Sequence, residues 1–352
     1  MSRRMPAEWE PHEATWIAWP HHEPDWPGKI EAVSWVYAEI VRVIARYERV
    51  EILCHDEKVE EEARRMIAAH DVEPDSYRLH RVATDRVWLR DSAPTAVVGE
   101  SGLEFVRWRF NAWAKYDNYA LDAKVPEAIA GVTDLPLVAA TRPDGRGPIV
   151  LEGGAIDTNG DGMLLVTEEC LLSEKVQVRN PGLDRDGYEH AFREYLGTRR
   201  TIWLGAGCVG DDTHGHIDDI ARFIAPDTVL LAYEADPADE NHESSEDNLR
   251  RLRLAGGDGT AFKVVQIPYP RAVVMDGARL PASYLNFYIA NGIVVVPTFN
   301  DTRDREALSQ IARLMPDREV VGIHAVDLVW GFGTLHCLTQ QQPAAPTRVR
   351  GR

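Results

Sequence analysis

The stretch AIDTNGDGMLLVT, residues 155–167, contains two short apolar runs separated by the turn residues Asn-Gly-Asp-Gly. Two such runs on either side of a turn are typical of a β-hairpin. A helical pattern follows at residues 187–196, and the apolar strand TIWLG follows that helix at 201–205. This part of the chain therefore predicts a unit of two strands, a helix and a third strand.

The same order of helix and strand recurs on both sides of this unit. Helical patterns precede apolar strands at 30–47 and VEILC (50–54), 57–70 and YRLHRV (77–82), 121–130 and LPLVAA (135–140), 245–254 and KVVQIP (263–268), and 303–314 and EVVGIHA (319–325). No repeat of fixed period is visible, so the prediction depends on element order. Five strand-strand-helix-strand modules favour a closed, propeller-like α/β ring over a doubly wound sheet.

No change in composition divides the chain, so we expect one α/β domain over residues 1–341. The segment QPAAPTRVRGR, residues 342–352, is rich in Pro and Arg and has no periodicity, and we expect it to be disordered.

The charge of the chain limits its partners. The 352 residues carry a formal net charge of −17, with 44% hydrophobic residues. A polyphosphate or an anionic membrane requires a basic face, so we expect neither nucleic acid nor a membrane as a partner. The acidity is compatible with a cationic ligand.

Cysteine spacing and hydropathy indicate the compartment. The four cysteines are far apart and include no C-x-x-C pair, which favours a reducing cytosol. The longest apolar candidate, Ile289–Phe299, is too short for a membrane span, and the N-terminus lacks the apolar core of a secretory signal. We therefore expect a cytoplasmic protein.

One motif matches the calcium loop of EF-hands. Asp157, Asn159, Asp161, Gly162 and Glu168 have the required spacing. A loop of that kind lies between two helices, whereas the flanking residues here are apolar and rich in glycine. The hairpin is the favoured interpretation.

A second motif, THGHIDD at 213–219, places His214, His216 and Asp218 at alternate positions. These three side chains resemble part of the zinc-ligand string of the metallo-β-lactamase-like hydrolases, but Asp219 occupies the position of the final histidine. In a strand the three side chains would share one face, with or without a metal. A zinc site and a metal-free polar cluster both remain open.

Three further segments carry reactive side chains. Cys337 lies in GFGTLHCLTQQQP after two glycines, Asp91 lies in WLRDSAP, and Glu152 lies in VLEGG. Each has a structural alternative, since an isolated cysteine is often a core residue and a carboxylate at a strand end often binds nearby amides. Arg90 could also neutralise Asp91.

Together these residues suit chemistry at a guanidinium carbon. A guanidinium remains protonated and presents a planar fork of N–H donors, which Asp91 and Asp218 could hold through paired bonds. A Cys337 thiolate is the natural nucleophile, stabilised by the cationic substrate or by His216. His216 could protonate the departing ammonia and then activate water.

Several long segments carry a family resemblance. They are MPAEWEPHEATWIAWPHHEPDWPGK (5–29), WLRDSAP (88–94), LEGGAIDTNGDGMLLVTEECLLS (151–173), GDDTHGHIDDIARF (210–223), LPASYLNFYIANGIVVVPTFND (280–301) and LHCLTQQQP (335–343). On these residues the chain resembles the agmatine deiminase family of the guanidino-group-modifying, or pentein, superfamily. The resemblance implies a five-bladed α/β-propeller of ββαβ modules with pseudo-fivefold symmetry. It also implies hydrolysis of agmatine to N-carbamoylputrescine and ammonia through a covalent amidino-cysteine, without a cofactor or a metal.

The resemblance also implies roles for single residues. The nucleophile falls on Cys337, the acid/base histidine on His216 and the guanidinium-binding carboxylates on Asp91 and Asp218. Glu152 supports the catalytic centre. Asp212, four residues before His216, matches an acidic position that holds part of the cationic substrate. A homodimer is an expectation from the family alone.

The chain departs from the family pattern beside this site. Phe332 and Thr334 replace a small, glycine-rich stretch before Cys337, and His214 replaces an asparagine before Gly-His. The departures leave another alkylguanidine, arginine or peptidyl arginine as alternative substrates. A zinc hydrolase and a catalytically silent guanidinium-binding protein are alternatives of a different class.

Overall fold

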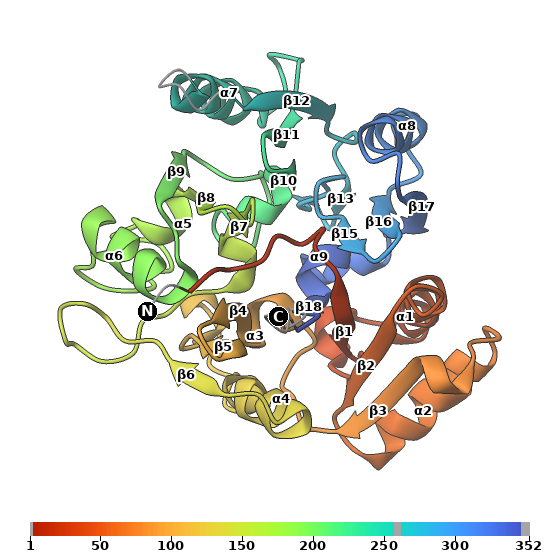
Figure 1. Cartoon of the computed structure of the whole chain (residues 1–352). Helices are drawn as coiled ribbons and strands as arrows, with labels where there is room; N and C mark the ends of the chain where they lie inside the picture. The colour runs from red at the N-terminus through yellow and green to blue at the C-terminus, as the bar shows by residue number, and fades with distance from the viewer. Residues whose placement is uncertain (1–2, 257–261, 346–352) are drawn as a thin grey trace, which may run out of the picture.

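The computed structural model describes residues 3–256 and 262–345, which form a mixed α/β fold. Their strands build five sheets of three or four strands and one separate two-stranded hairpin, β13 (Val274–Met275) and β14 (Ala278–Arg279). In Figure 1 the five larger sheets are arranged around a common centre. Among the described residues, no helix combines the length and the apolar character that a membrane span requires.

Four of the sheets have the same construction. Two antiparallel strands are followed by a helix and then by a third strand, parallel to the second. The elements are β4 (Thr95–Gly99), β5 (Gly102–Arg107), α4 (Val125–Thr133) and β6 (Leu137–Ala139); β7 (Asp157–Thr158), β8 (Met163–Thr167), α6 (Arg185–Leu196) and β9 (Arg200–Leu204); β10 (Ala221–Ala225), β11 (Thr228–Tyr233), α7 (His242–Gly256) and β12 (Lys263–Pro268); and β15 (Tyr288–Ala290), β16 (Ile293–Thr298), α8 (Asp304–Leu314) and β17 (Glu319–His324).

The predicted unit around residues 155–167 is confirmed. Strands β7 and β8 pair antiparallel, with Asp157 opposite Leu165, and the turn between them contains Gly160 and Gly162, both with positive φ. The segment that matches the calcium-loop pattern is therefore a hairpin between two strands, as we expected. Helix α6 and the parallel strand β9 complete the module.

The remaining sheet joins the two ends of the chain. It contains β1 (His12–Ala18), α1 (Ile30–Ile44), β2 (Arg49–Cys54), α2 (Glu57–Ala68), β3 (Tyr77–Arg81) and β18 (Gln340–Pro343), in the strand order β18-β1-β2-β3. Strand β18 lies antiparallel to β1, with Gln342 opposite Ala14. The last strand of the chain therefore completes its first sheet.

The expected start of a disordered tail at residue 342 is wrong. Gln342 and Pro343 belong to β18 and are buried. Their polar composition conceals a buried strand because the amides find partners: Trp16 Nε1 donates to Gln342 Oε1 at 2.9 Å, and Arg90 Nη1 donates to Gln341 Oε1 at 2.7 Å. Residues 346–352 of the predicted tail lie outside the described part of the chain.

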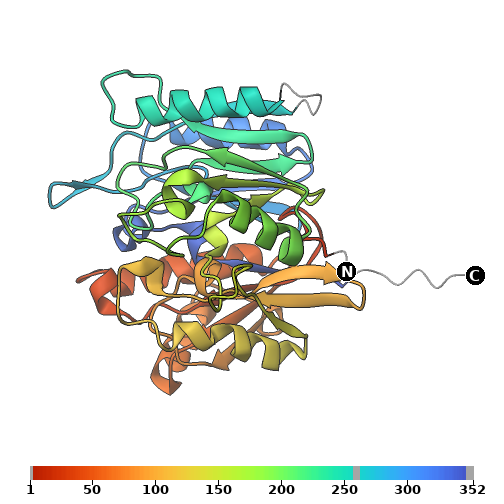
Figure 2. The ribbon, with the colours of Figure 1, turned by 90° about the vertical axis from the view of Figure 1, so that its left-hand side faces the viewer.

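Helices cover the outer surfaces of the sheets. Figures 1 and 2 agree that α7 and α4 lie at opposite outer ends of the molecule. The central strand β16 is apolar on both faces and is buried along Ile293–Pro297. Such continuous burial is typical of strands within α/β sheets that are covered on both sides.

The N-terminal segment, residues 3–11, crosses the centre of the molecule before β1 (Figure 1). Arg4 exchanges two backbone hydrogen bonds with Val98 beside β4, at 3.0 and 2.8 Å, and Met5 N donates to Leu196 O at 2.9 Å. These bonds hold the N-terminal segment against strand β4 and against the end of helix α6. Its next residues, Ala7 and Glu8, are buried.

The attachment of the N-terminal segment can be tested at Gly197, the residue that follows α6. Gly197 has a φ of 72°, and a Cβ there would lie 1.7 Å from the carbonyl oxygen of Arg3. Gly145 has a φ of 73° and an open surrounding, so Gly145→Ala is a matched control. Both alanines would adopt a left-handed backbone at a cost of about 1–2 kcal/mol.

We expect Gly197→Ala to lower the free energy of unfolding by about 1–3 kcal/mol more than Gly145→Ala does, because the N-terminal segment must move. Urea unfolding of the two variants measures the difference. Equal losses would contradict the close packing of the segment against α6.

Candidate active site

Cys337 lies at the closed end of a cavity of about 340 Å³. It belongs to the short helix α9 (Leu335–Leu338), directly before β18, and its side chain is buried apart from the face toward the cavity. Five aromatic side chains line it: Trp88, Trp113, Tyr116, Trp330 and Phe332. The other three cysteines, Cys54, Cys170 and Cys208, are also buried and reduced, and they do not line this cavity.

Asp91 is positioned by the helix α3 (Leu89–Ser92) and by donors from two other segments. Its Oδ1 accepts a bond from Gly154 N at 3.0 Å, and its Oδ2 accepts one from Trp113 Nε1 at 2.9 Å. Burial raises the pKa of Asp91 to about 6, against the opposing charge of His216. Arg90 points the other way and does not neutralise Asp91, since its guanidinium bonds to Gln341 and other buried groups.

His216 lies between two of the predicted carboxylates. Its Nδ1 is 3.7 Å from Asp91 Oδ1, and its Nε2 is 3.9 Å from Glu152 Oε2. Burial opposes the imidazolium, but Asp91, Cys170 and Glu152 outweigh it and raise the pKa of His216 well above its ordinary value. Arg179 Nε donates to Glu152 Oε1 at 2.8 Å, which keeps that buried carboxylate ionised.

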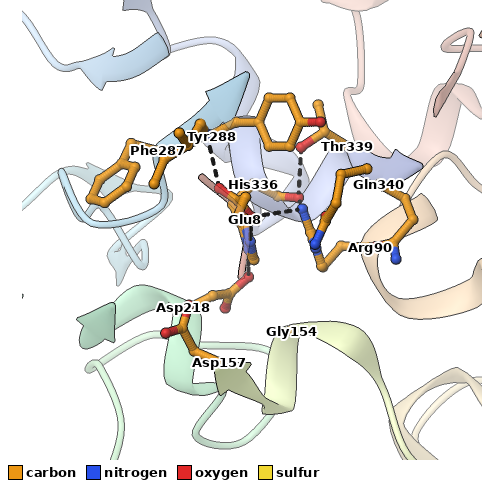
Figure 3. Close-up of polar contacts among 12 residues, drawn as sticks. Glu8, Arg90, Gly154, Asp157, Asp218, Phe287, Tyr288, His336, Thr339 and Gln340 are labelled. Carbon is orange, nitrogen blue, oxygen red and sulfur yellow. Dashed lines mark hydrogen bonds and ion pairs between the residues drawn. The ribbon is translucent and has the colours of Figure 1, made fainter. Parts of the chain in front are cut away.

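Asp218 contacts the thiol of Cys337. Its Oδ2 is 3.7 Å from Cys337 Sγ and accepts a bond from His336 Nδ1 at 2.7 Å (Figure 3). Its Oδ1 is buried and has no hydrogen-bond partner. Burial, together with the charges of Asp218, Asp219 and Asp91, raises the pKa of Cys337 well above its ordinary value.

Gly154 lies where His216 and the predicted carboxylates Asp91 and Asp218 come close together. A Cβ on this residue would lie 2.5 Å from His216 Nδ1, 2.8 Å from Asp91 Oδ1 and 3.1 Å from Asp218 Oδ2. The second glycine of LEGG is thus required by the packing of three polar side chains. The structure therefore brings Cys337, His216, Asp91, Glu152 and Asp218 into one buried group.

Asp212 lies at a different part of the cavity, together with Asp25. Tyr116 Oη donates to Asp212 Oδ2 at 2.8 Å, and Lys115 forms an ion pair with its other oxygen. Burial raises the pKa of Asp25 to about 6, although Arg86 pairs with it. Asp25 Oδ2 is buried and has no hydrogen-bond partner.

The zinc site that was an alternative interpretation of His214, His216 and Asp218 is not supported by their arrangement. The segment is a turn followed by a 3₁₀ helix at Ile217–Asp219, not a strand, so the alternating positions do not share a face. His214 has a φ of 64° and faces Glu169, with 3.6 Å between Nδ1 and Oε1. Within the described residues the one group with metal-ligand spacing is Glu152, Cys170 and His216, and Arg179 already pairs with its carboxylate.

The two departures before Cys337 differ in their placement. Phe332 adopts a left-handed φ of 64° and lines the cavity, so it contributes to the shape of the substrate pocket. Thr334 is buried, and its hydroxyl donates to Asn286 Oδ1 at 2.8 Å. Thr334 therefore supports the backbone before the thiol and does not line the cavity.

Sequence reasoning missed several residues of this site. Asn286 Nδ2 donates to Cys337 Sγ at 3.0 Å, Trp113 and Arg179 hold the carboxylates, and Cys170 contacts His216. A buried role for Asn286 could have been predicted, because an asparagine inside the apolar segment YLNFYIA requires buried hydrogen-bond partners. The others come from segments without any local pattern of this kind.

The chain is similar to known proteins over nearly its whole length. The family model described as Porphyromonas-type peptidyl-arginine deiminase matches residues 4–343. An agmatine deiminase of Medicago truncatula is 35% identical over 97% of this chain and 96% of its own. The solved agmatine deiminase of Enterococcus faecalis, described as catalysing its reaction, has a TM-score of 0.86 at 30% identity, with 97% of this chain and 96% of that chain covered. A cysteine-to-serine variant of the C. jejuni agmatine deiminase with substrate bound has the same TM-score and coverage at 26% identity.

The state of the Cys337 thiol is open to a direct test. Because its pKa lies well above the ordinary value, only a small thiolate fraction is present at neutral pH. We expect the rate of Cys337 alkylation by iodoacetamide to rise about tenfold per pH unit up to pH 9, without a plateau. Peptide mass spectrometry measures the rate, with Cys337→Ser as the control for labelling elsewhere. A plateau below pH 8 would contradict the structure.

Proposed function

Because the chain belongs to the Porphyromonas-type peptidyl-arginine deiminase family of the pentein superfamily, we propose that it hydrolyses the guanidinium group of agmatine. The products are N-carbamoylputrescine and ammonia. The observation that carries this proposal is the convergence of two buried carboxylates near one thiol: Asp91 and Asp218 both approach Gly154, Asp218 contacts Cys337, and Asp91 lines the same cavity as Cys337. A planar guanidinium between them has N–H donors for both carboxylates.

The unpartnered Oδ1 of Asp218 supports this binding mode. A buried carboxylate oxygen without a donor is costly, and a guanidinium N–H would provide the missing bond. Asp91, whose pKa is raised to about 6, would become fully ionised beside such a cation. Binding would therefore give Asp218 Oδ1 a hydrogen-bond donor and Asp91 a cationic partner.

The substrate also assists the nucleophile. The acids around Cys337 disfavour the thiolate, and the positive guanidinium between them opposes that effect. The thiol releases its proton to solvent when the substrate binds, and Sγ forms a bond to the guanidinium carbon. The C=N electron pair moves onto nitrogen, which gives a neutral tetrahedral adduct.

His216 then acts first as an acid and second as a base. Its imidazolium protonates the –NH₂ group of the adduct, the C–N bond breaks, and ammonia leaves a cationic amidino-cysteine. The neutral imidazole next takes a proton from water as hydroxide adds to the same carbon. The C–S bond breaks, the new oxygen gives up its proton to form C=O, and Cys337 regains a proton. Glu152, held by Arg179, supports the imidazolium.

The charges along the cavity favour agmatine over arginine. Three acids line it, Asp25, Asp91 and Asp212, whereas the lining cation, Arg86, pairs with Asp25. The amine of agmatine would find the unpartnered oxygen of Asp25 or the carboxylate of Asp212. An α-carboxylate would lie beside these acids without a free cation among the described lining residues. The aromatic walls suit the four methylenes between the two charged ends.

Three further predictions accompany this function. We propose that the ring of sheets is a five-bladed α/β-propeller with pseudo-fivefold symmetry. The cytoplasmic location and the homodimer remain predictions from the sequence.

A substrate panel with ammonia as the readout tests the choice of substrate. We expect kcat/KM for agmatine to exceed that for free arginine by at least about 100-fold, because the additional α-carboxylate of arginine would be repelled by Asp25 and Asp212. A peptidyl arginine and other alkylguanidines complete the panel. A preference for arginine or for the peptide would contradict the assignment of agmatine while leaving the reaction class intact.

Replacement of the thiol tests the mechanism. We expect Cys337→Ala to lose at least about 10⁴-fold in turnover, because no covalent intermediate can form. Binding of agmatine, measured by calorimetry, should persist since Asp91 and Asp218 remain. Cys54→Ala, a buried cysteine of β2 outside the cavity lining, is the matched control and should retain activity. Ammonia release by Cys337→Ala at a rate near that of the control would show that the nucleophile is wrongly assigned.

A further inference from the structure

The carboxylate of Glu8 lies buried among four hydrogen-bond donors behind the catalytic group (Figure 3). Its Oε1 accepts bonds from Arg222 Nη2 and Ile289 N, both at 2.8 Å. Its Oε2 accepts bonds from His336 Nε2 at 2.8 Å and Arg90 Nη2 at 3.2 Å. Burial opposes ionisation, but Arg222, His336 and Arg90 outweigh it and hold the pKa of Glu8 well below its ordinary value. Glu8 is therefore an ionised carboxylate that only accepts hydrogen bonds.

His336 connects Glu8 to the catalytic group. Its second ring nitrogen, Nδ1, lies 2.7 Å from Asp218 Oδ2. Burial also opposes ionisation of Asp218, but His336 and His216 lower its pKa below the ordinary value. Two ionised carboxylates offer no proton to the imidazole, so each ring nitrogen must donate one of its own. An imidazolium, with two N–H donors, satisfies both contacts of the ring, at 2.7 and 2.8 Å.

The charges that surround His336 also favour its doubly protonated form. Arg222 Nε also donates to Asp157 Oδ2 at 2.7 Å, which adds a third carboxylate to the buried network. With His336 protonated, three cations balance three anions: Arg90, Arg222 and His336 against Glu8, Asp157 and Asp218. A neutral His336 would leave one uncompensated negative charge in the interior, which is strongly unfavourable.

We propose that Glu8 and His336 form a positioning pair, in which Glu8 keeps His336 doubly protonated and His336 fixes Asp218 with one oxygen free for the guanidinium. This inference rests on the proposed role of Asp218. His336 occupies Oδ2, so Oδ1 is the oxygen left for the substrate. The His336 N–H also draws the lone pairs of Oδ2 away from Cys337 Sγ, 3.7 Å distant, and so reduces repulsion of the thiolate.

Glu8→Gln tests the pair because all four neighbours of Glu8 are donors. The amide NH₂ of a glutamine must face one pair of them. If it faces His336 and Arg90, His336 Nε2 must lose its proton and accept; if it faces Arg222 and Ile289 N, the network loses a buried acceptor on that side. In both arrangements the negative charge of Glu8, which stabilises the imidazolium of His336, is lost.

Glu10→Gln is the matched control. Glu10 lies on the same N-terminal segment and pairs with Arg4, but its side chain is 30% exposed and does not contact the catalytic group. We expect Glu8→Gln to lower kcat/KM for agmatine by about 10- to 100-fold through displacement of Asp218, and Glu10→Gln to stay within about threefold of the unsubstituted protein.

A spectroscopic measurement on the unsubstituted protein needs no variant. In a ¹⁵N-histidine spectrum at pH 7, the His336 ring should show two N–H groups, one facing Asp218 and one facing Glu8. In Glu8→Gln the Nε2 proton should be lost or exchange much faster. A role of Glu8 in stability alone would leave the protonation of His336 unchanged.

The outcomes separate this inference from the proposed function. A single N–H on His336 in the unsubstituted protein overturns the positioning pair, even where Glu8→Gln fails to fold. A folded Glu8→Gln variant with the kcat/KM of Glu10→Gln overturns it as well. Absence of ammonia release from agmatine by the unsubstituted protein contradicts the function instead, and the His336 spectrum still decides the protonation state.

Discussion

The carboxylate of Glu8 is the contact on which the centre of this molecule depends. Its partners come from four different parts of the ring: Arg90 of α3, Arg222 of β10, Ile289 of β15 and His336 of α9. Through Arg222 and Asp157 it also reaches β7. One acid on the N-terminal segment thus connects all five larger sheets at their common centre. An ion network of this kind is poor evidence for stability, but it fixes the relative positions of its members.

That constraint explains how a site with so many acids is possible. Asp91, Glu152 and Asp218 would repel one another if each lacked a partner, and burial would increase the repulsion. Two of these acids have a cationic partner: Arg179 pairs with Glu152, and His336 pairs with Asp218. Asp91 accepts bonds from two neutral donors, and His216 lies nearby. With the imidazolium of His216 included, each of the three acids has a cation nearby. In the proposed function, a guanidinium would add a further positive charge beside Asp91 and Asp218.

Much of the fold could be predicted from local patterns. The hairpin at 155–167 and the alternation of helix and strand follow from turn residues and apolar spacing, both of which act over a few residues. The motifs around Asp91, Glu152, His216, Asp218 and Cys337 were visible for the same reason, and the structure brings these side chains together, while their roles remain predictions. Glu8 was not predicted, because its contact with His336 spans 328 residues and neither sequence position shows the partner. Gln342 and Pro343 were misread as the start of a disordered tail, since the burial of Gln342 depends on a partner elsewhere in the chain, Trp16.

The pairing of β18 with β1 has a consequence for the order in which the protein folds. Strand β1 leaves the ribosome before the other described strands, yet its antiparallel neighbour, β18, leaves after all of them. Until residues 340–343 emerge, the edge of β1 that pairs with β18 presents unpaired backbone groups, a state prone to association with other chains. The same closing segment carries Cys337. A nascent chain therefore acquires Cys337 and the strand that pairs with this edge together, after the other described strands have been made.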